Sequence, residues 1–165
     1  MAKKFALLTA LALVMVLGPV LIANGGTFSG KWISASEMSN STVSKVFSDN
    51  DWESSASGEG LKVKTPEGRV FLVEWDTDKN LLAYVAYYNF NAGVTNKQKM
   101  ELVNRINDEV VFCKAMVDKD GDLRFEYYLH YETGISDRQI LDSAKFFIMT
   151  TRFAVDKKDP DNLLK

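Results

Sequence analysis

The most regular alternation of apolar and polar positions in the chain runs from residue 123 to residue 132. One row of this segment is Leu123, Phe125, Tyr127, Leu129 and Tyr131, and the other row is Arg124, Glu126, Tyr128, His130 and Glu132. Because successive side chains of a strand point to opposite faces, this period of two predicts a strand whose apolar row faces the core. The polar row is expected to be exposed.

Other segments also have the composition of strands. They are a weak hairpin over residues 52–64, two stronger strands over 69–75 and 81–90, and a strand over 110–117. Residues 81–90 carry apolar groups on both faces, which predicts a central strand with a spare face for a partner or a second copy of the chain. In 110–117 the single cysteine, Cys113, belongs to an apolar row with Val111, Ala115 and Val117, so we expect it to be buried.

Three helix starts are indicated by capping boxes, in which Ser or Thr is followed three residues later by Glu or Gln. The boxes begin at Ser34, Thr95 and Ser136, and apolar stripes extend from them to about residues 48, 108 and 155. In the last helix, Phe146, Met149 and Phe153 lie off the centre of the stripe. This predicts either a second covering layer or an association face.

The order of these elements predicts one α+β domain, with helices packed on an antiparallel sheet. The order is helix, three or four strands, helix, two strands, helix, which is α-β-β-β-α-β-β-α in its shorter form. A chain of 165 residues is long enough for one domain with a substantial core. We place this domain at residues 34–155, between a linker at 24–33 and a polar tail at 156–165.

Residues 1–23 have the pattern of a secretory signal peptide. Lys3 and Lys4 precede an apolar run that ends at Ala23, where a polar stretch begins. Cleavage is expected after Ala23, with a cut after Gly25 as an alternative. An uncleaved anchor is the other alternative, because the 19 residues from Phe5 to Ala23 can span a bilayer. We therefore expect a periplasmic or secreted protein, or one anchored in the inner membrane and facing the periplasm.

Composition excludes several kinds of protein. The net charge is −2 and no basic stripe occurs, which argues against a general nucleic-acid binder. With one cysteine, the chain can form no internal disulfide, no cysteine-rich metal site and no lipoprotein anchor. Contact with a membrane is therefore expected only through the N-terminal segment, if it is not cleaved.

Residues 118–122 (Asp-Lys-Asp-Gly-Asp) are the segment that most resembles a metal site. Three aspartates match the first positions of a calcium loop, but Leu123 and Leu129 occupy the positions of its required glycine and glutamate. A second acidic loop, beginning at Asp76, fails at the same two positions. The segment fits a type I turn with a glycine bulge at Gly121 better, so we expect no metal or cofactor here.

The sequence offers no set of residues for catalysis. The only histidine, His130, lies on the polar face of its strand beside Glu126 and Glu132, with no nucleophile motif elsewhere. The two glutamates are expected to be ordinary solvated charges. We therefore predict that the protein is not an enzyme.

Three short motifs stand in the second half of the chain: Leu-Val-Asn-Arg-Ile-Asn at 102–107, the Asp-Lys-Asp-Gly-Asp hairpin at 118–122, and Gly-Ile-Ser at 134–136. With the aromatic final helix, they resemble the YbjN family of bacterial proteins over about residues 34–153. The resemblance implies a fold like that of type III secretion chaperones, small α+β proteins that bind other proteins and often dimerise. Family members are described as sensory transduction regulators with no established reaction. Val110-Val111 departs from the family, where Arg-Phe is common.

The functional hypothesis is an exported, non-enzymatic, protein-binding or regulatory domain of the bacterial envelope, sensory or chaperone-like in role. Its partner is an unidentified protein, and a homodimer remains open. The alternative is a small-ligand-binding protein or enzyme with a pocket built from Trp75, Tyr84 and Tyr88. Asn104 and Asn107 would either line a shallow groove or tie their helix to the next strand, and the structural role is favoured.

Overall fold

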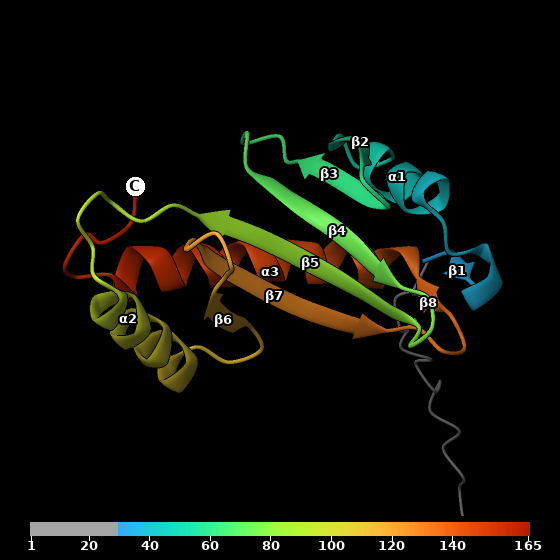
Figure 1. Cartoon of the computed structure of the whole chain (residues 1–165). Helices are drawn as coiled ribbons and strands as arrows, with labels where there is room; N and C mark the ends of the chain where they lie inside the picture. The colour runs from blue at the N-terminus through green and yellow to red at the C-terminus, as the bar shows by residue number, and fades with distance from the viewer. Residues whose placement is uncertain (1–29) are drawn as a thin grey trace, which may run out of the picture.

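The computed structural model describes residues 30–165, so the predicted signal peptide lies outside the described residues. In chain order, the elements are β1 (Trp32–Ile33), the 3₁₀ helix η1 (Ala35–Glu37), α1 (Asn40–Ser48), β2 (Glu53–Ser57), β3 (Gly60–Lys64), β4 (Val70–Asp76), β5 (Leu81–Tyr88), α2 (Asn96–Glu109), β6 (Lys114–Val117), β7 (Leu123–His130), β8 (Ile135–Ser136) and α3 (Asp137–Lys158). Figure 1 shows their arrangement. None of the helices between residues 30 and 165 is long and apolar enough to cross a membrane.

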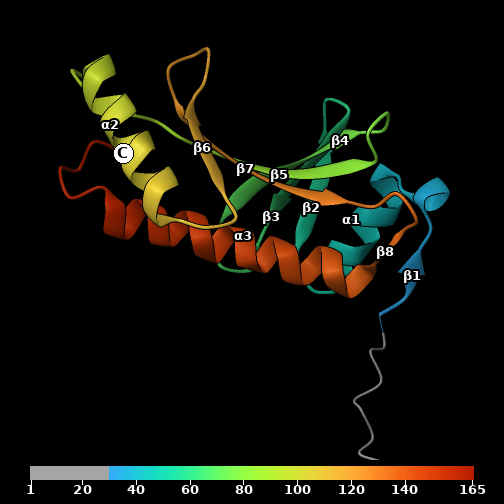
Figure 2. The ribbon, with the colours of Figure 1, turned by 90° about the horizontal axis from the view of Figure 1, so that it is seen from below.

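Six strands form one antiparallel sheet in the order β2-β3-β4-β5-β7-β6. The long helix α3 runs along one face of this sheet beside α1, and α2 lies next to β6 (Figures 1 and 2). The predicted α+β class is therefore confirmed, and β5 is central, as its two apolar faces predicted. Between α1 and α2 there are four strands, which is the longer of the two predicted forms.

The core lies between the sheet and the helices α1 and α3. Phe71 on β4 is at its centre, with its ring 5.8 Å from that of Tyr84 and 5.9 Å from that of Phe47. Tyr84 is fully buried, and its hydroxyl donates a 2.7 Å hydrogen bond to the Ile140 carbonyl on α3. The alternating row Leu123, Phe125, Tyr127, Leu129 and Tyr131 faces this core, as predicted.

The first predicted helix is divided in two. The capping box of Ser34 and Glu37 is present, but it opens the single turn η1, because Met38 is extended with ψ 116°. Ser39 then caps α1 by accepting a hydrogen bond from the Thr42 amide. Of the other two boxes, Thr95 and Gln98 cap α2 as predicted, whereas at Ser136 only the serine half is formed.

The strand predicted over 110–117 is shorter than expected. β6 begins at Lys114, and the side chains of Val111 and Phe112 are 67% and 69% exposed. Here the chain must turn sharply from the end of α2 into the sheet, and Phe112 adopts a left-handed backbone conformation with φ 68°. Cys113, the next residue, is buried as predicted.

Both predicted boundary segments contribute to the domain. The end of the linker forms β1, which pairs with β8 through Trp32 and Ser136. The helix α3 continues to Lys158, beyond the predicted end of the domain, and the C-terminal segment is not purely polar, because Leu163 and Leu164 are buried. On the outer side of α3, Met149 remains 61% exposed, so no second layer covers it within residues 30–165.

Candidate functional site

The candidate site is the face of the sheet opposite α1 and α3. No helix in residues 30–165 lies over its central strands (Figure 2). Val70, Tyr87 and Tyr128 are 48%, 42% and 48% exposed on this face, which we call the open face. Val85 is nonetheless fully buried there, because side chains from β4 and β7 close over it.

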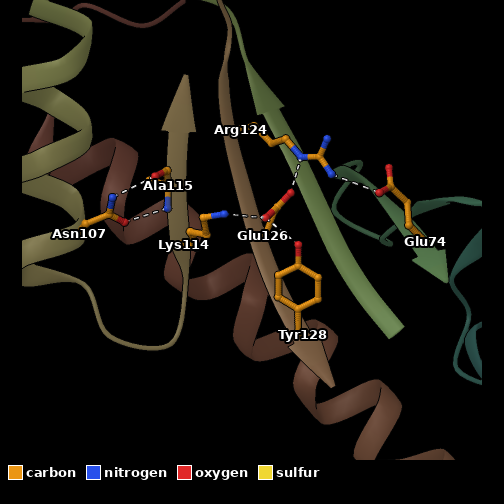
Figure 3. Close-up of polar contacts among 7 residues, drawn as sticks. All are labelled: Glu74, Asn107, Lys114, Ala115, Arg124, Glu126 and Tyr128. Carbon is orange, nitrogen blue, oxygen red and sulfur yellow. Dashed lines mark hydrogen bonds and ion pairs between the residues drawn. The ribbon is translucent and has the colours of Figure 1, made fainter. Parts of the chain in front are cut away.

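A buried carboxylate lies at the centre of the open face. Glu126 on β7 is only 6% exposed, although its strand position points away from the helices. Its carboxylate lies 2.8 Å from Arg124 Nε and 3.6 Å from Lys114 Nζ, and it accepts a 2.7 Å hydrogen bond from the Tyr128 hydroxyl (Figure 3). Lys114 reaches it because Lys114 and Glu126 are paired across β6 and β7.

Arg124 extends this network across the sheet. Its Nη2 donates a 3.2 Å hydrogen bond to Glu74 on β4, two strands away (Figure 3). Its guanidinium lies 5.5 Å from the centre of the Tyr87 ring. The Nε–H group does not point at Glu126, so that contact is a charge interaction without an aligned hydrogen bond. The guanidinium is therefore held from three sides in one orientation.

The environment of the nearby titratable groups favours their neutral forms. Burial, together with the hydrogen bond to Glu126, raises the pKa of Tyr128 to about 12. Burial also raises the pKa of the Cys113 thiol to about 12. At neutral pH Tyr128 is a hydrogen-bond donor, and Cys113 is a protonated thiol that is a poor nucleophile. In the part of the chain described, no group of three His, Cys, Asp or Glu side chains is placed to hold a metal ion.

The prediction that Glu126 is an ordinary solvated charge is wrong, whereas His130 and Glu132 are exposed as predicted. The alternation correctly placed Glu126 on the face away from the helices. Its burial depends on Lys114, Arg124 and Tyr128, of which Lys114 comes from another strand. The sequence signal was Arg124 and Tyr128 at i−2 and i+2 on the same strand face, but this pattern is also common on solvated strands.

The predicted aromatic residues do not take part in this cluster. Trp75, Tyr84 and Tyr88 point to the helix side of the sheet, where Tyr88 packs edge-on against Phe125. Tyr84 is fully buried and offers no surface to a ligand. Trp75 is half-buried, and its indole N–H is enclosed without a partner in residues 30–165. The three side chains are therefore part of the core packing.

The two predicted asparagines have different environments. Asn107 Oδ1 accepts a 2.8 Å hydrogen bond from the Ala115 amide, and Asn107 Nδ2 donates a 2.9 Å bond to the Ala115 carbonyl (Figure 3). The side chain thus satisfies the outer edge of β6 as a neighbouring strand would, and it ties α2 to the sheet. Asn104 is exposed, with no side-chain hydrogen bond in the described part of the chain.

The acidic segment at 118–122 is a hairpin turn, as predicted. The Gly121 amide donates a 3.2 Å bond to the Asp118 carbonyl, and Gly121 has φ 86°. Asp118 Oδ1 accepts from the amides of Asp120 and Asp122, so its carboxylate is used to hold the turn. Lys99 on α2 donates to the Gly121 carbonyl and fixes the turn against the helix.

The fold and the sequence have known counterparts. A family model named YbjN, described as "Putative bacterial sensory transduction regulator", matches residues 39–155. Among solved structures, the crystal structure of YbjN from E. coli, described there as "a putative transcription regulator", superposes with a TM-score of 0.63 at 14% identity, over 76% of this chain and 94% of that chain. A comparison with curated proteins finds no match.

The two findings agree, since the segment that the family model matches runs from α1 into the last turn of α3, and the shared fold is the sheet with its helices. At 14% identity, the structural likeness shows the fold alone. Because the family model matches most of the sequence, the chain is a member of the YbjN family, which is described as a family of bacterial sensory transduction regulators.

Proposed function

We propose that the chain is an exported, non-enzymatic regulator that binds a partner protein on the open face of its sheet. The observation that carries this proposal is the network around Glu126, which holds Arg124 beside the exposed rings of Tyr87 and Tyr128. Tyrosine and arginine are enriched at the energetic centres of protein interfaces. A side chain that is already ordered loses little conformational entropy on binding, which favours affinity.

The charge pattern of this face favours a protein partner over a small ligand. Arg124, Lys114 and Glu74 lie on β7, β6 and β4, so the charged network extends across four neighbouring strands and forms a broad surface. Interfaces between proteins are broad and enriched in aromatic residues and arginine, whereas sites for small molecules are concave. A regulatory or a chaperone-like role would act through the same contact.

Export rests on the N-terminal sequence. Lys3 and Lys4, the apolar run and the small residue Ala23 have the order of a signal peptide. Mass spectrometry of the chain purified from its native host should find a mature N-terminus at Asn24, or at Gly26 if the later site is used. An intact N-terminus in the membrane fraction would support the anchored alternative instead.

The docking proposal is tested by cross-linking in the native host, followed by purification of the tagged full-length chain. The open-face variant Tyr87→Ser/Tyr128→Ser should lose a partner that the wild type recovers. The control Met100→Ser/Phe153→Ser removes two apolar side chains of similar exposure, 49% each, from the helices, and it should retain the partner.

Two outcomes contradict the proposal. Equal recovery of the same partner with the open-face variant and the wild type would show that docking uses another surface. If the chain is recovered alone and monomeric while a small molecule raises its melting temperature, the small-ligand alternative is favoured.

A further inference from the structure

A groove runs along α3 on the helix side of the sheet, separate from the open face. One hollow, of about 480 Å³, lies between β1, α1 and the start of α3, with Ile33, Val46 and Leu141 among its apolar lining residues. The next, of about 490 Å³, lies between the β3–β4 turn and the middle of α3, where Trp52 and Ile148 are among the lining residues. Lys145 lines both hollows, so they adjoin.

Basic side chains line the groove at regular intervals. Arg138, Lys145 and Arg152 are seven residues apart on α3, which places them on nearly the same side of the helix. From the opposite walls come Lys31, Lys45 and Arg69. Six basic and four acidic side chains line the two hollows, a surplus of two positive charges on a chain whose formal net charge is −2.

Part of this charge is already neutralised. Lys45 pairs with Asp49 at 2.8 Å, Arg138 pairs with Asp142 at 3.3 Å, and Arg152 pairs with Asp156 at 3.2 Å. In contrast, neither Lys145 nor Arg69 has a carboxylate within ion-pair distance among residues 30–165. Lys31, in the first hollow, also has no ion pair among these residues, so the three unpaired cations are Lys31 in the first hollow, Arg69 in the second and Lys145 between the two.

The second hollow also presents apolar surface. Met149 on its rim is 61% exposed, while Trp52 in its lining is buried, with only 7% of its surface exposed. Methionine is a flexible, polarisable side chain that adapts to varied apolar groups at binding surfaces. The combination of two unneutralised cations and an exposed methionine fits a ligand that carries both carboxylates and an apolar side chain.

We propose that this groove binds an acidic peptide segment of a partner protein. The carboxylates of this peptide segment face Lys145 and Arg69, and an apolar side chain of the segment packs against Met149. An anionic membrane surface is the less favoured occupant, because a flat layer of phospholipid headgroups would not enter the hollow between the β3–β4 turn and α3, whereas the side chains of a peptide can. Charge complementarity of this kind speeds association and suppresses wrong partners.

The test is a selection of random peptides displayed on phage against the immobilised full-length chain. We expect the selected peptides to be rich in Asp and Glu and to contain an apolar residue. A selected peptide, labelled and measured by fluorescence anisotropy, should bind Lys145→Glu about tenfold more weakly than wild type. Lys119→Glu, on the distant hairpin turn, is the matched charge control and should change the affinity less than twofold.

A second variant separates charge from apolar packing. Met149→Ser should weaken binding with its salt dependence unchanged, whereas Lys145→Glu should reduce the salt dependence. The open-face variant Tyr87→Ser/Tyr128→Ser should bind the peptide normally, so failure here and failure of the open-face proposal are distinguishable.

Three results would overturn the proposal. They are a selection that yields no peptide, selected peptides without acidic residues, and equal affinity for wild type and Lys145→Glu. Binding of the chain to phosphatidylglycerol vesicles that is lost in Lys145→Glu, with no peptide selected, would identify the groove as a membrane contact instead.

Discussion

The central strands bury side chains in two different ways on their two faces. On the helix side, Phe71 and Phe125 are apolar and are covered by another layer of the fold. On the open face, Glu126 is almost equally buried, yet what covers it is a set of charged and polar neighbours. The first arrangement stabilises the fold, because apolar surface leaves water. The second gains little net stability but fixes the orientation of a surface.

The largest effect is expected on the helix side, at Phe71. Phe71→Ala should lower the free energy of unfolding by about 3 to 5 kcal/mol, because it removes a ring that contacts Phe47, Trp52 and Tyr84 and leaves a cavity. Equilibrium denaturation in urea measures the change. The matched control is Val70→Ala, next along the strand and 48% exposed on the open face, which should cost less than about 1 kcal/mol. Equal costs would contradict the difference between the faces.

Glu126→Ala should have the next largest effect. Removal of the carboxylate leaves Arg124, which is only 25% exposed, without one of its two charge partners, and we expect a loss of about 2 to 3 kcal/mol. Replacing both Arg124 and Glu126 with leucine should recover most of this loss, because the charges that then lose a partner, Glu74 and Lys114, are 42% and 64% exposed and stay hydrated. If the double variant is as unstable as Glu126→Ala, the cost comes from packing and not from the unpaired charge.

These two sites differ in how far the sequence predicts them. The burial of Phe71 and Phe125 is predictable, because apolar residues recur at every second position and the face that they form must be covered. The burial of Glu126 is not, because period-two alternation shows only which face a residue occupies. Whether a residue on that face is exposed to solvent depends on Lys114 and on other side chains that come into contact only after the strands pair.

The same limit explains the errors at the edges of the fold. Val111 and Phe112 are apolar and continue a strand-like pattern, yet they are exposed because the chain turns there from α2 into β6. Leu163 and Leu164 are buried although the residues before them are polar, because the Asn91 amide holds that segment through the Leu163 carbonyl. Such contacts between distant segments have no local pattern. Capping and turn motifs do, which is why α2 and the hairpin at 118–122 were predicted correctly.

The turn at Gly121 controls which residues face each side. A slip of one residue between β6 and β7 would exchange the two faces, so the turn must be specific. Gly121→Val should cost about 2 kcal/mol, because φ is 86° and a β-branched residue resists that conformation. Thermal unfolding measures the effect of both substitutions, and Asp120→Asn should have almost no effect. A substantial calcium-dependent rise in melting temperature that is absent in Asp120→Asn would instead indicate a metal site.

Asn107 holds the outer edge of the same hairpin. Asn107→Ala should cost about 1 to 2 kcal/mol, because both its hydrogen bonds go to backbone groups of β6 that would be left unpaired. Amide hydrogen exchange should become faster at Ala115. Asn104→Ala, on the same helix, is the control and should leave both stability and exchange unchanged. Equal effects of the two substitutions would show that the bonds of Asn107 contribute little.

The smallest effect is expected at Tyr128. Its pKa of about 12 in the folded chain lies above its ordinary value of 10, so the folded state holds this proton more tightly than the unfolded state. The stability that this provides is present below pH 10 and is lost as the pH rises from about 10 to about 12. Absorbance of the ionised phenol, as the difference between wild type and Tyr128→Phe, measures this pKa directly. Glu126→Gln should lower it, because the carboxylate no longer repels the developing negative charge; an unchanged value would mean that burial alone sets it.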